Sequence, residues 1–230
     1  MIGMLIRSLV YSWRYRGRRV TVKRTAHVSH TAELEGLNRV GHHTTFRGRL
    51  GLGSYIGKHC ELAADIGRYS SIAHHVSSNP GIHTYKAPYA TTSPLFFNRD
   101  HLNGPSFATH DVIDNLRYAD RGRRLDVAIG NDCWICSNVF FAGGVRVADG
   151  GVVLAGAVVT RDVKPYEIVG GVPARTVGYR YDPDTIAFLQ RLRWWDMPEA
   201  WLRENWQLLN DLDGLKAAFP ELTAPATGGS

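Results

Sequence analysis

Apolar residues recur every six positions in the second half of the chain. The column comprises Ile129, Ile135, Phe141, Val147, Val153 and Val159. Three residues after each of them stands a residue type that tolerates turn or left-handed backbone, namely Asp132, Asn138, Gly144, Gly150, Gly156 and Asp162. Four residues after each stands a small or β-branched residue, namely Cys133, Val139, Val145, Gly151, Ala157 and Val163. This period is neither helical nor that of one alternating strand, so each unit is interpreted as a short strand and a bend.

Three such units close a triangular coil, and successive coils stack at the roughly 4.8 Å spacing of neighbouring strands. The apolar column then points into a prism, and the Asp, Asn and Gly residues form its corners. The repeat therefore predicts a mainly β protein built as a parallel β-helix.

The first half of the chain repeats less regularly. Val28, Leu34, Val40 and Phe46 are six residues apart, Leu50, Ile56 and Leu62 resume the period after a slip, and Ile66 and Ile72 resume it after another. The slips indicate irregular coils or a misplaced frame. Together with the later run, the pattern predicts about five coils.

The repeat is absent between Val76 and Val127, which predicts an extended loop over about 77–126. Long excursions from a compact domain often carry function. We divide the chain into a basic, amphipathic N-terminal segment (1–27), the β-helix (28–178), C-terminal helices (179–213) and a tail (214–230). Asp182 and Pro183 predict a helix start. The tryptophans of the helical region are interpreted as packing residues: Trp194, Trp195, Trp201 and Trp206.

The composition fits a soluble globular protein, with 44% hydrophobic and 21% charged residues among 230. The net charge is +6, and the segment from Trp13 to Arg24 holds six basic residues and no acid. Such a segment suits nucleic acid, an anionic membrane surface, a phosphorylated ligand or a solvated end. The opening "MIGMLIRSLVYSW" is too short to span a bilayer, and its basic cluster follows the apolar part, unlike a signal peptide.

Three cysteines cannot form a complete disulfide framework, which favours a reducing compartment. Cys133-x-x-Cys136 lacks a second ligand pair, so we expect no metal site. A zinc site of the carbonic anhydrase type would include two histidines five residues apart, and this chain has no such pair. That alternative and a non-catalytic scaffold remain as minor interpretations.

The segment "IGNDCWICSNVFFAGGVRVADGGVVLAGAVVTRDVKPYEIVGGVPAR" resembles the hexapeptide-repeat acyltransferases. The looped-out histidine, "SPLFF" (Ser93 to Phe97) and the Trp-rich end are similar to the xenobiotic acetyltransferase and sugar O-acetyltransferase branch. The resemblance implies a left-handed parallel β-helix and a homotrimer whose active sites lie between adjacent prisms. It also implies acetyl-CoA as acyl donor, lying along the groove.

The same resemblance assigns roles to residues. The essential histidine of the family corresponds to His83. The positions that contact CoA in the related galactoside-type enzymes correspond to Ser137, Ala155, Thr160, Arg161 and Arg175. Two of these motifs differ from the family pattern: Cys136 replaces a glycine, and Arg161 replaces a lysine and keeps the charge with a different geometry.

Acetyl transfer from a thioester to a hydroxyl needs a base, donors for the oxyanion and a way to protonate the leaving thiolate. A histidine with a pKa of about 6.5 suits the first and last tasks, so His83 is the expected general base. Backbone N–H groups near Ala142 and Gly143 are expected along the groove as oxyanion donors. His101 and His110 are candidates for acceptor contacts. Histidines inside the coils are interpreted as structural: His42, His43, His59, His74 and His75.

We therefore expect an acetyl-CoA-dependent O-acetyltransferase that acts on a saccharide, such as a surface polysaccharide or a glycan precursor, without an acyl-enzyme. Alternatives are N-acetylation of an amino sugar and O-acetylation of an antibiotic. We expect no nucleic acid partner and a cytoplasmic location, with the N-terminal basic segment as a candidate contact to the inner membrane surface.

Overall fold

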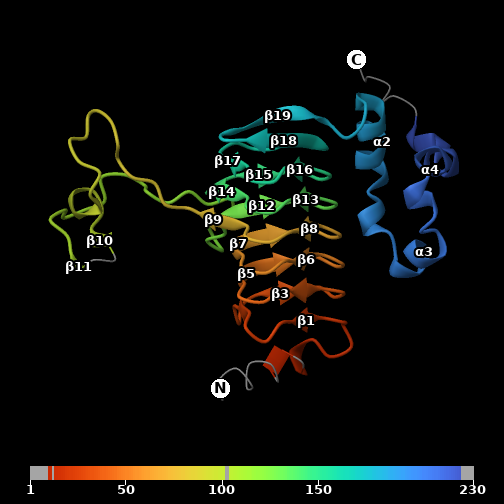
Figure 1. The fold of residues 1–230 in the computed structure, drawn as a ribbon, viewed down its shortest axis with the longest axis horizontal. Helices are drawn as coiled ribbons and strands as arrows, with labels where there is room; N and C mark the ends of the chain where they lie inside the picture. Colours follow the sequence, from red (N-terminus) through yellow and green to blue (C-terminus); the bar gives the residue numbers. More distant parts are fainter. Residues whose placement is uncertain (1–9, 12, 102–103, 224–230) are drawn as a thin grey trace.

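The computed structural model describes residues 10–11, 13–101 and 104–223. Its centre is a prism of stacked coils, with an arm projecting from one side and helices lying along another (Figure 1). The predicted fold class is confirmed: a left-handed parallel β-helix with a looped-out insertion and a C-terminal helical extension.

One side of the prism, called face 1 here, is an eight-stranded sheet. Its strands are β1 (Thr21–Val22), β4 (Arg39–Val40), β6 (Tyr55–Ile56), β8 (Ser71–Ile72), β13 (Trp134–Ile135), β16 (Val152–Val153), β18 (Glu167–Gly171) and β19 (Ala174–Tyr179). All neighbours pair in parallel except β18 and β19, which form an antiparallel hairpin at the end of the prism. Each parallel pair is separated in sequence by a whole coil, as parallel pairing requires.

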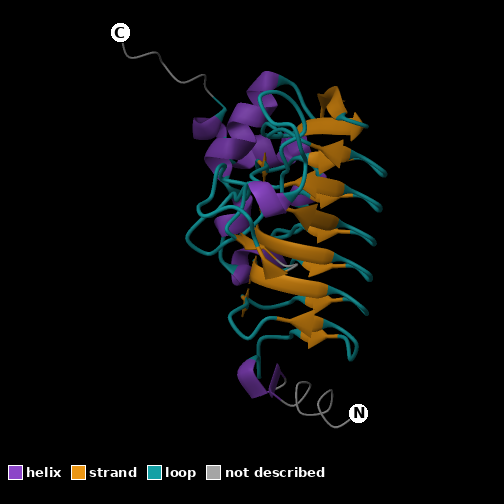
Figure 2. Ribbon diagram, turned by 90° about the vertical axis from the view of Figure 1, so that its left-hand side faces the viewer, coloured by secondary structure: helices purple, strands orange, loops and turns teal. Residues whose placement is uncertain are grey.

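The other two sides form one nine-stranded sheet, because two strands run around the corner between them. Face 2 comprises β2 (His27–Val28), the first halves of β5 (Thr45–Leu50) and β7 (Glu61–Ile66), β9 (Ser77–Asn79), β14 (Phe140–Ala142) and β17 (Val158–Val159). Face 3 comprises β3 (Glu33–Leu34), the second halves of β5 and β7, β12 (Val127–Ile129) and β15 (Arg146–Val147). The corners are named edge 1/2, edge 2/3 and edge 3/1 after the faces that they join. Figure 2 shows the turns of successive coils aligned along one edge.

The apolar column points into the prism, as predicted. Its members from Ile129 to Val159 are all at most 3% exposed. The corner residues three positions later have positive φ, for example 53° at Asp132 and 61° at Asn138, whereas Asp162 does not. The same corner position in the earlier coils holds larger residues, namely Leu37, His43, His59, Tyr69 and His75.

The two slips in the earlier repeat are corners shortened by two residues. Phe46 and Leu50 both lie on β5, and Leu62 and Ile66 both lie on β7, where each strand runs through edge 2/3 without a separate turn. All four side chains are buried. The long excursion leaves the prism at the same edge, between β9 and β12. Edge 2/3 therefore accepts both deletion and insertion while the inner column stays buried.

The C-terminal region is helical. Its elements are α2 (Pro183–Leu192), η2 (Trp194–Asp196), α3 (Glu199–Glu204), η3 (Leu208–Asn210), α4 (Leu212–Ala218) and η4 (Pro220–Leu222). The predicted start is confirmed, since the Asp182 carboxylate accepts the N–H of Thr185 at 2.9 Å. Trp194 packs on Tyr69 with ring centroids 5.1 Å apart, which attaches the helices to edge 3/1. Trp206 is 58% exposed, so the predicted packing role is wrong for it.

The prism begins earlier, and the helical region ends later, than the ranges expected from the sequence. β1, which pairs with β4, lies inside the predicted N-terminal segment, and α4 extends from the predicted helical region into the predicted tail. Residues 1–9 of that segment and 224–230 of the tail lie outside the described residues. None of the helices in the described ranges is long and apolar enough to span a bilayer.

Candidate active site

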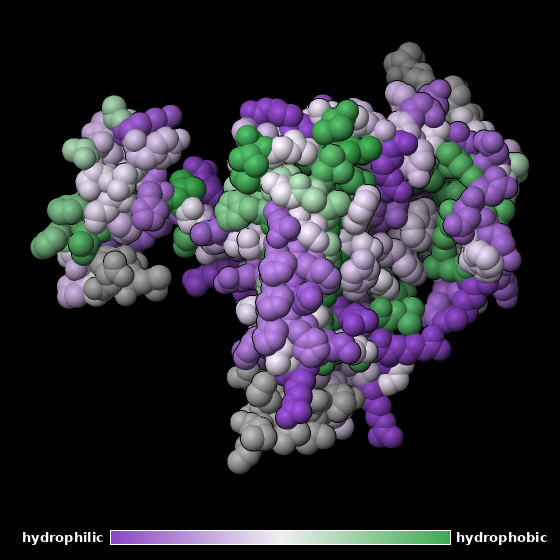
Figure 3. All heavy atoms as spheres, viewed as in Figure 1, coloured by the Kyte–Doolittle hydropathy of each residue, from purple (hydrophilic) through white to green (hydrophobic). Residues whose placement is uncertain are grey.

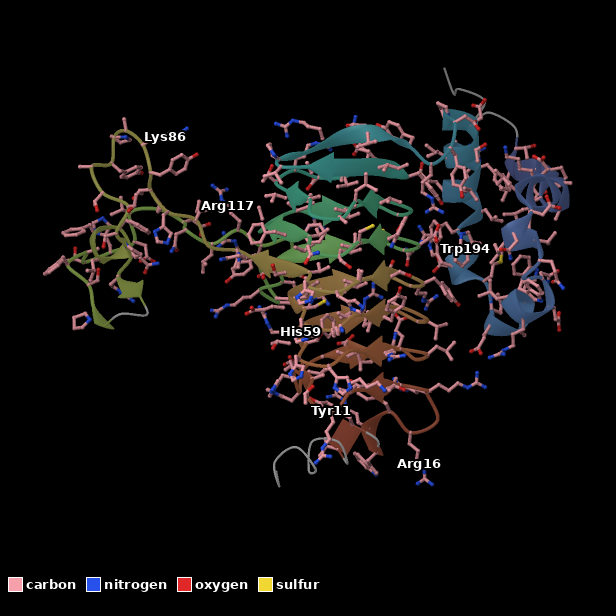
Figure 4. All side chains as sticks on the ribbon, in the orientation of Figure 1. Tyr11, Arg16, His59, Lys86, Arg117 and Trp194 are labelled. Atoms are coloured by element: carbon pink, nitrogen blue, oxygen red, sulfur yellow. The ribbon has the colours of Figure 1, made fainter. Side chains whose placement is uncertain are left out.

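The excursion forms an arm with a two-stranded root. The N–H of Ile82 donates to the carbonyl of Asn115 at 2.9 Å, and the N–H of Arg117 donates to that of Pro80 at 2.8 Å. Figure 4 shows Arg117 between the prism and the arm. Further out, the arm contains η1 (Pro94–Phe96) and a small hairpin of β10 (Asp100–His101) and β11 (Gly104–Pro105).

Gly143 attaches this root to the prism. Its N–H donates to the carbonyl of Asn79 at 2.9 Å. A Cβ at this position would lie 2.3 Å from the carbonyl oxygen of Arg117, so only glycine allows the two backbones to approach. The expectation that this N–H serves as an oxyanion donor does not fit the structure, because the N–H already has an acceptor.

His83 lies on the arm beyond β9 and is exposed to solvent. Its Nδ1 is 2.8 Å from the carbonyl oxygen of Thr92. Since a carbonyl oxygen only accepts, Nδ1 is the donor, and Nε2 of the neutral ring is left with a free lone pair. The ring also meets Phe97 edge-on, with 5.7 Å between centroids. These two contacts fix the tautomer and the orientation that a general base needs.

The arm exposes large apolar side chains while it buries few of its own. Phe97 is 2% exposed, whereas Tyr85 is 77% exposed and Phe107 is 73% exposed. Figure 3 shows hydrophobic residues on the outer part of the arm, away from the prism. Exposed aromatic groups on one projecting segment are typical of a surface that contacts another molecule.

The residues predicted to contact CoA border face 2 in the last coils. Ser137 and Ala155 occupy equivalent corner positions on edge 1/2, two residues after buried members of the inner column. Thr160 directly follows β17 and is exposed, and Ala142 and Gly143 lie at the end of β14 on edge 2/3. The fold thus brings residues that are far apart in sequence to both borders of one face.

Arg161 and Arg175 differ in their surroundings. The Arg161 guanidinium holds the buried Glu167 carboxylate with two hydrogen bonds of 2.8 and 3.2 Å, and it also donates to Thr176. Burial opposes ionisation of Glu167, but the hydrogen bonds from Arg161 and Thr176 outweigh it and lower its pKa to about 2. Arg175 is exposed and contacts only the adjacent Ala174 carbonyl among the described residues. Arg175 is therefore the cation free to meet a phosphate, whereas Arg161 is already neutralised.

The three cysteines are buried and unbridged. Burial raises the pKa of the Cys133 thiol to about 12 and also raises that of Cys136. Neither thiol is therefore a nucleophile at neutral pH. Among the described residues, no three or more His, Cys, Asp or Glu side chains are grouped as ligands for a metal ion.

A stack of histidines on edge 1/2 was interpreted from sequence as structural only. His43, His59 and His75 occupy the same corner in successive coils, and their ring centroids are 5.0 Å apart in both pairs. Loss of contact with water and repulsion from the neighbouring histidines lower the pKa of His59. The spacing of sixteen residues, which equals the length of these coils, was the signal in the sequence.

Asp126 was also missed. It is 5% exposed, and its Oδ2 accepts from the Ser78 hydroxyl at 2.8 Å, while its Oδ1 has no partner among the described residues. Burial raises its pKa. It lines a cavity of about 500 Å³ beside the arm root, together with Glu61 and Arg47. A lone aspartate at the end of an irregular loop gives no sequence signal for such a position.

His101 and His110 are the loop histidines predicted to contact the acceptor. His110 is exposed, and its Nδ1 lies 3.3 Å from the Thr109 hydroxyl. The side chain of His101 lies outside the described residues. Neither is brought to His83 by a contact that the structure describes.

No protein-family model matches the chain. A chloramphenicol acetyltransferase from Agrobacterium fabrum is 42% identical over 99 residues, which are 43% of this chain and 41% of that protein. Another from Klebsiella aerogenes is 30% identical over 73% of this chain and 64% of that protein. The galactoside O-acetyltransferase of Escherichia coli K12 is 35% identical over 34% of this chain and 39% of that protein. The chain thus spans less than two thirds of the length of each of these relatives.

Among solved structures, a maltose O-acetyltransferase from Clostridium difficile 630 aligns with a TM-score of 0.37 and 19% identity, over 71% of this chain and 70% of that one.

Proposed function

We propose that this chain, which belongs to the hexapeptide-repeat acyltransferases, transfers an acetyl group from acetyl-CoA to a hydroxyl group of a saccharide. The observation that carries the proposal is the geometry of His83. Its Nδ1 is committed to a backbone carbonyl, and its Nε2 is free on an arm that projects from the prism. The saccharide is a surface polysaccharide or a glycan precursor.

His83 acts as the base in this proposal. Nε2 takes the proton of the acceptor hydroxyl while the oxygen attacks the thioester carbon and forms the new C–O bond. The tetrahedral intermediate then expels the CoA thiolate, and the imidazolium returns the proton to sulfur. The Thr92 carbonyl stabilises the imidazolium, because it continues to accept from Nδ1. No acyl-enzyme is needed, which agrees with the high pKa of the buried Cys133 thiol.

The acyl donor lies along face 2 in this proposal. Ser137, Ala155 and Thr160 contact the pantetheine, and Arg175 binds the 3′-phosphate. The partner that completes the site is a second copy of this chain in a homotrimer. The exposed aromatic residues of the arm support this, since their burial against a neighbouring prism would also deliver His83 to its groove.

We place the protein in the cytoplasm. The Arg-rich N-terminal segment, from which Figure 4 labels Arg16, is the candidate contact to the inner membrane surface.

An antibiotic O-acetyltransferase is the second candidate. It is favoured by the relatives, several of which are named chloramphenicol acetyltransferases. N-acetylation of an amino sugar uses the same donor and base, so it belongs to the same test. All three functions require CoA to bind, and they differ only in the acceptor.

The test has two parts. CoA at micromolar concentration should raise the Tm of the protein, since a ligand that binds only the folded state stabilises it. Release of CoA from acetyl-CoA should then be measured against a panel of sugars, nucleotide sugars, amino sugars and chloramphenicol. His83→Ala should lower turnover by at least about 100-fold, the share that general base catalysis commonly supplies, and leave the Tm shift with CoA unchanged. Normal turnover by His83→Ala, or no Tm shift with CoA, would overturn the proposal.

A further inference from the structure

A cavity of about 530 Å³ opens on face 1 and edge 1/2 in the first coils, away from the predicted CoA residues. Its polar lining is Lys23, Arg39, Lys58, His42, His74 and Tyr55. These side chains come from successive coils, which the parallel register of β1, β4, β6 and β8 brings side by side. None of them belongs to the predicted CoA site.

The charge of this cavity is unbalanced. Lys23, Arg39 and Lys58 form no ion pair within the part of the chain that the structure describes, and no carboxylate lines the cavity. Like charges held close together repel one another, and a bound anion removes that repulsion. The lining is therefore suited to a carboxylate or a phosphate group.

One aromatic ring lines the cavity, and a second lies beyond it on the same face. Tyr55 lies on its floor and is 43% exposed, and Trp134 lies farther along the same face and is 53% exposed. The two are linked in register through Ser71, with Tyr55 paired to Ser71 and Ser71 paired to Trp134. Rings that combine an apolar face with a polar tip are suited to contact sugar rings, which have the same mixed character.

The cavity lies within two coils of one border of the predicted CoA site. Trp134 lies two coils beyond Tyr55, which is about 10 Å at the spacing of stacked strands. Ser137, one of the predicted CoA residues, follows Trp134 within the same coil. A short oligosaccharide spans this distance, whereas the flat surface of a bilayer does not enter a concave site.

We propose that this cavity binds the anionic group of a saccharide acceptor, so that a neighbouring sugar unit presents its hydroxyl to His83. The inference rests on the proposed function and narrows its substrate class to acidic glycans. The anionic group is a carboxylate, as in a uronic acid, or a phosphate, as in a phosphodiester-linked sugar.

The experiment measures binding without acetyl-CoA, so it does not depend on turnover. Tetragalacturonate, a phosphodiester-linked sugar oligomer and neutral tetragalactose are titrated into the protein by calorimetry at low salt. We expect one or both acidic oligomers to bind, with affinity that falls as salt is raised, and at least 10-fold weaker binding of the neutral oligomer. The better of the two acidic probes identifies the anionic group.

The double variant Arg39→Gln/Lys58→Gln should weaken binding of the acidic oligomer at least 10-fold. The matched control, Arg16→Gln/Arg24→Gln, removes the same charge outside the cavity and should change binding less than 2-fold. Equal losses in both double variants, or equal binding of acidic and neutral oligomers, would overturn the proposal. So would binding to phosphatidylglycerol vesicles that depends on Arg39 and Lys58 while no acidic oligomer binds. The Tm shift with CoA tests the proposed function separately, so the two failures are distinguishable.

Discussion

Two neighbouring regions of the prism differ in whether their charged side chains form ion pairs. Beside face 3, Glu35 pairs with Arg49 and Arg68 at 2.9 Å each, and Asp65 pairs with Arg49 at 2.8 Å and with Arg123 at 2.6 Å. On face 1 and edge 1/2, the cations of the cavity form no ion pair among the described residues. The same fold thus carries a column of paired charges (the balanced column) on one side and a cluster of cations without carboxylates (the unbalanced cluster) on the other.

This difference distinguishes charged side chains that stabilise the fold from those that are available to bind ligands. The balanced column joins segments that are distant in sequence, because Arg123 comes from the return of the arm and Arg68 also contacts Asp196 in the helical region. The cations of the unbalanced cluster join no segments through ion pairs within the described part of the chain, so their charges can be removed with little loss of stability. The same contrast recurs at the predicted CoA site, between Arg161 and Arg175.

The largest expected effect comes from removing Arg161, the paired cation at the predicted CoA site. Arg161→Ala should destabilise the protein by about 2 kcal/mol, because it leaves the Glu167 carboxylate buried without its partner. At this chain length that loss corresponds to a fall in Tm of about 4–8 °C. Arg175→Ala should leave the Tm within about 1 °C, since Arg175 is exposed and unpaired among the described residues. Thermal unfolding without ligand measures both.

For CoA affinity, Arg175 should matter more than Arg161, which is the reverse of their order for stability. Arg175→Ala should weaken binding of CoA about 10-fold and leave dephospho-CoA unchanged, because a phosphate held by one exposed arginine is worth about 1.4 kcal/mol. An equal loss for both ligands would show that Arg175 does not contact the 3′-phosphate.

A smaller effect is expected from the balanced column of face 3. Glu35→Ala should cost about 1.5 kcal/mol, because Arg49, Arg68 and the N–H of Leu52 all lose their acceptor. The matched change on the unbalanced side, Arg39→Gln/Lys58→Gln, should alter the free energy of unfolding by less than about 0.5 kcal/mol. Chemical denaturation of the two variants compares them, and equal losses would mean that the two regions do not differ.

Most of the fold could be predicted from sequence because its repeat is local and strict. Each inner residue such as Ile135 or Val153 needs only its own six-residue unit to be identified. The shortened corners could not be placed, since a deletion of two residues at edge 2/3 and a wrong frame give the same slip in the column. Only the pairing of β5 with β7 across both faces shows that the frame is right.

The candidate site was less predictable, because its features depend on contacts between coils. His83 could be found from its place in the excursion and a family resemblance, but its hydrogen bond to Thr92 could not. The charge of Arg161 is neutralised by Glu167. Glu167 is buried because β18 and β19 form a hairpin, and the sequence alone does not show this. The unpaired cations at the cavity look in sequence like any other exposed lysines and arginines.

The smallest effect concerns pH and the histidine stack of the unbalanced side. His59 is faced by His75, His43, Lys58 and His74, and desolvation together with their repulsion lowers its pKa. The unfolded chain therefore binds a proton at His59 more readily, and stability falls as the pH drops from about 7.5 through the ordinary histidine value near 6.5. The paired carboxylates Glu35 and Asp65 act in another window. Their pKa values are lowered in the folded state, so the stability that they contribute is lost only as the pH falls below about 5.

His59→Asn should therefore flatten the decline of Tm between pH 7.5 and 5 and leave the acid transition below about pH 5 unchanged. Asparagine is the suitable replacement, since His59 has a φ of 58° and Asn138 occupies the same corner of a later coil with a φ of 61°. His30→Asn, an exposed histidine outside the stack, is the control and should keep the decline of the unaltered protein. If His59→Asn and His30→Asn gave the same Tm profile, the stack would contribute nothing to the pH dependence, and only the unpaired lysines and arginines would distinguish that side of the prism from face 3.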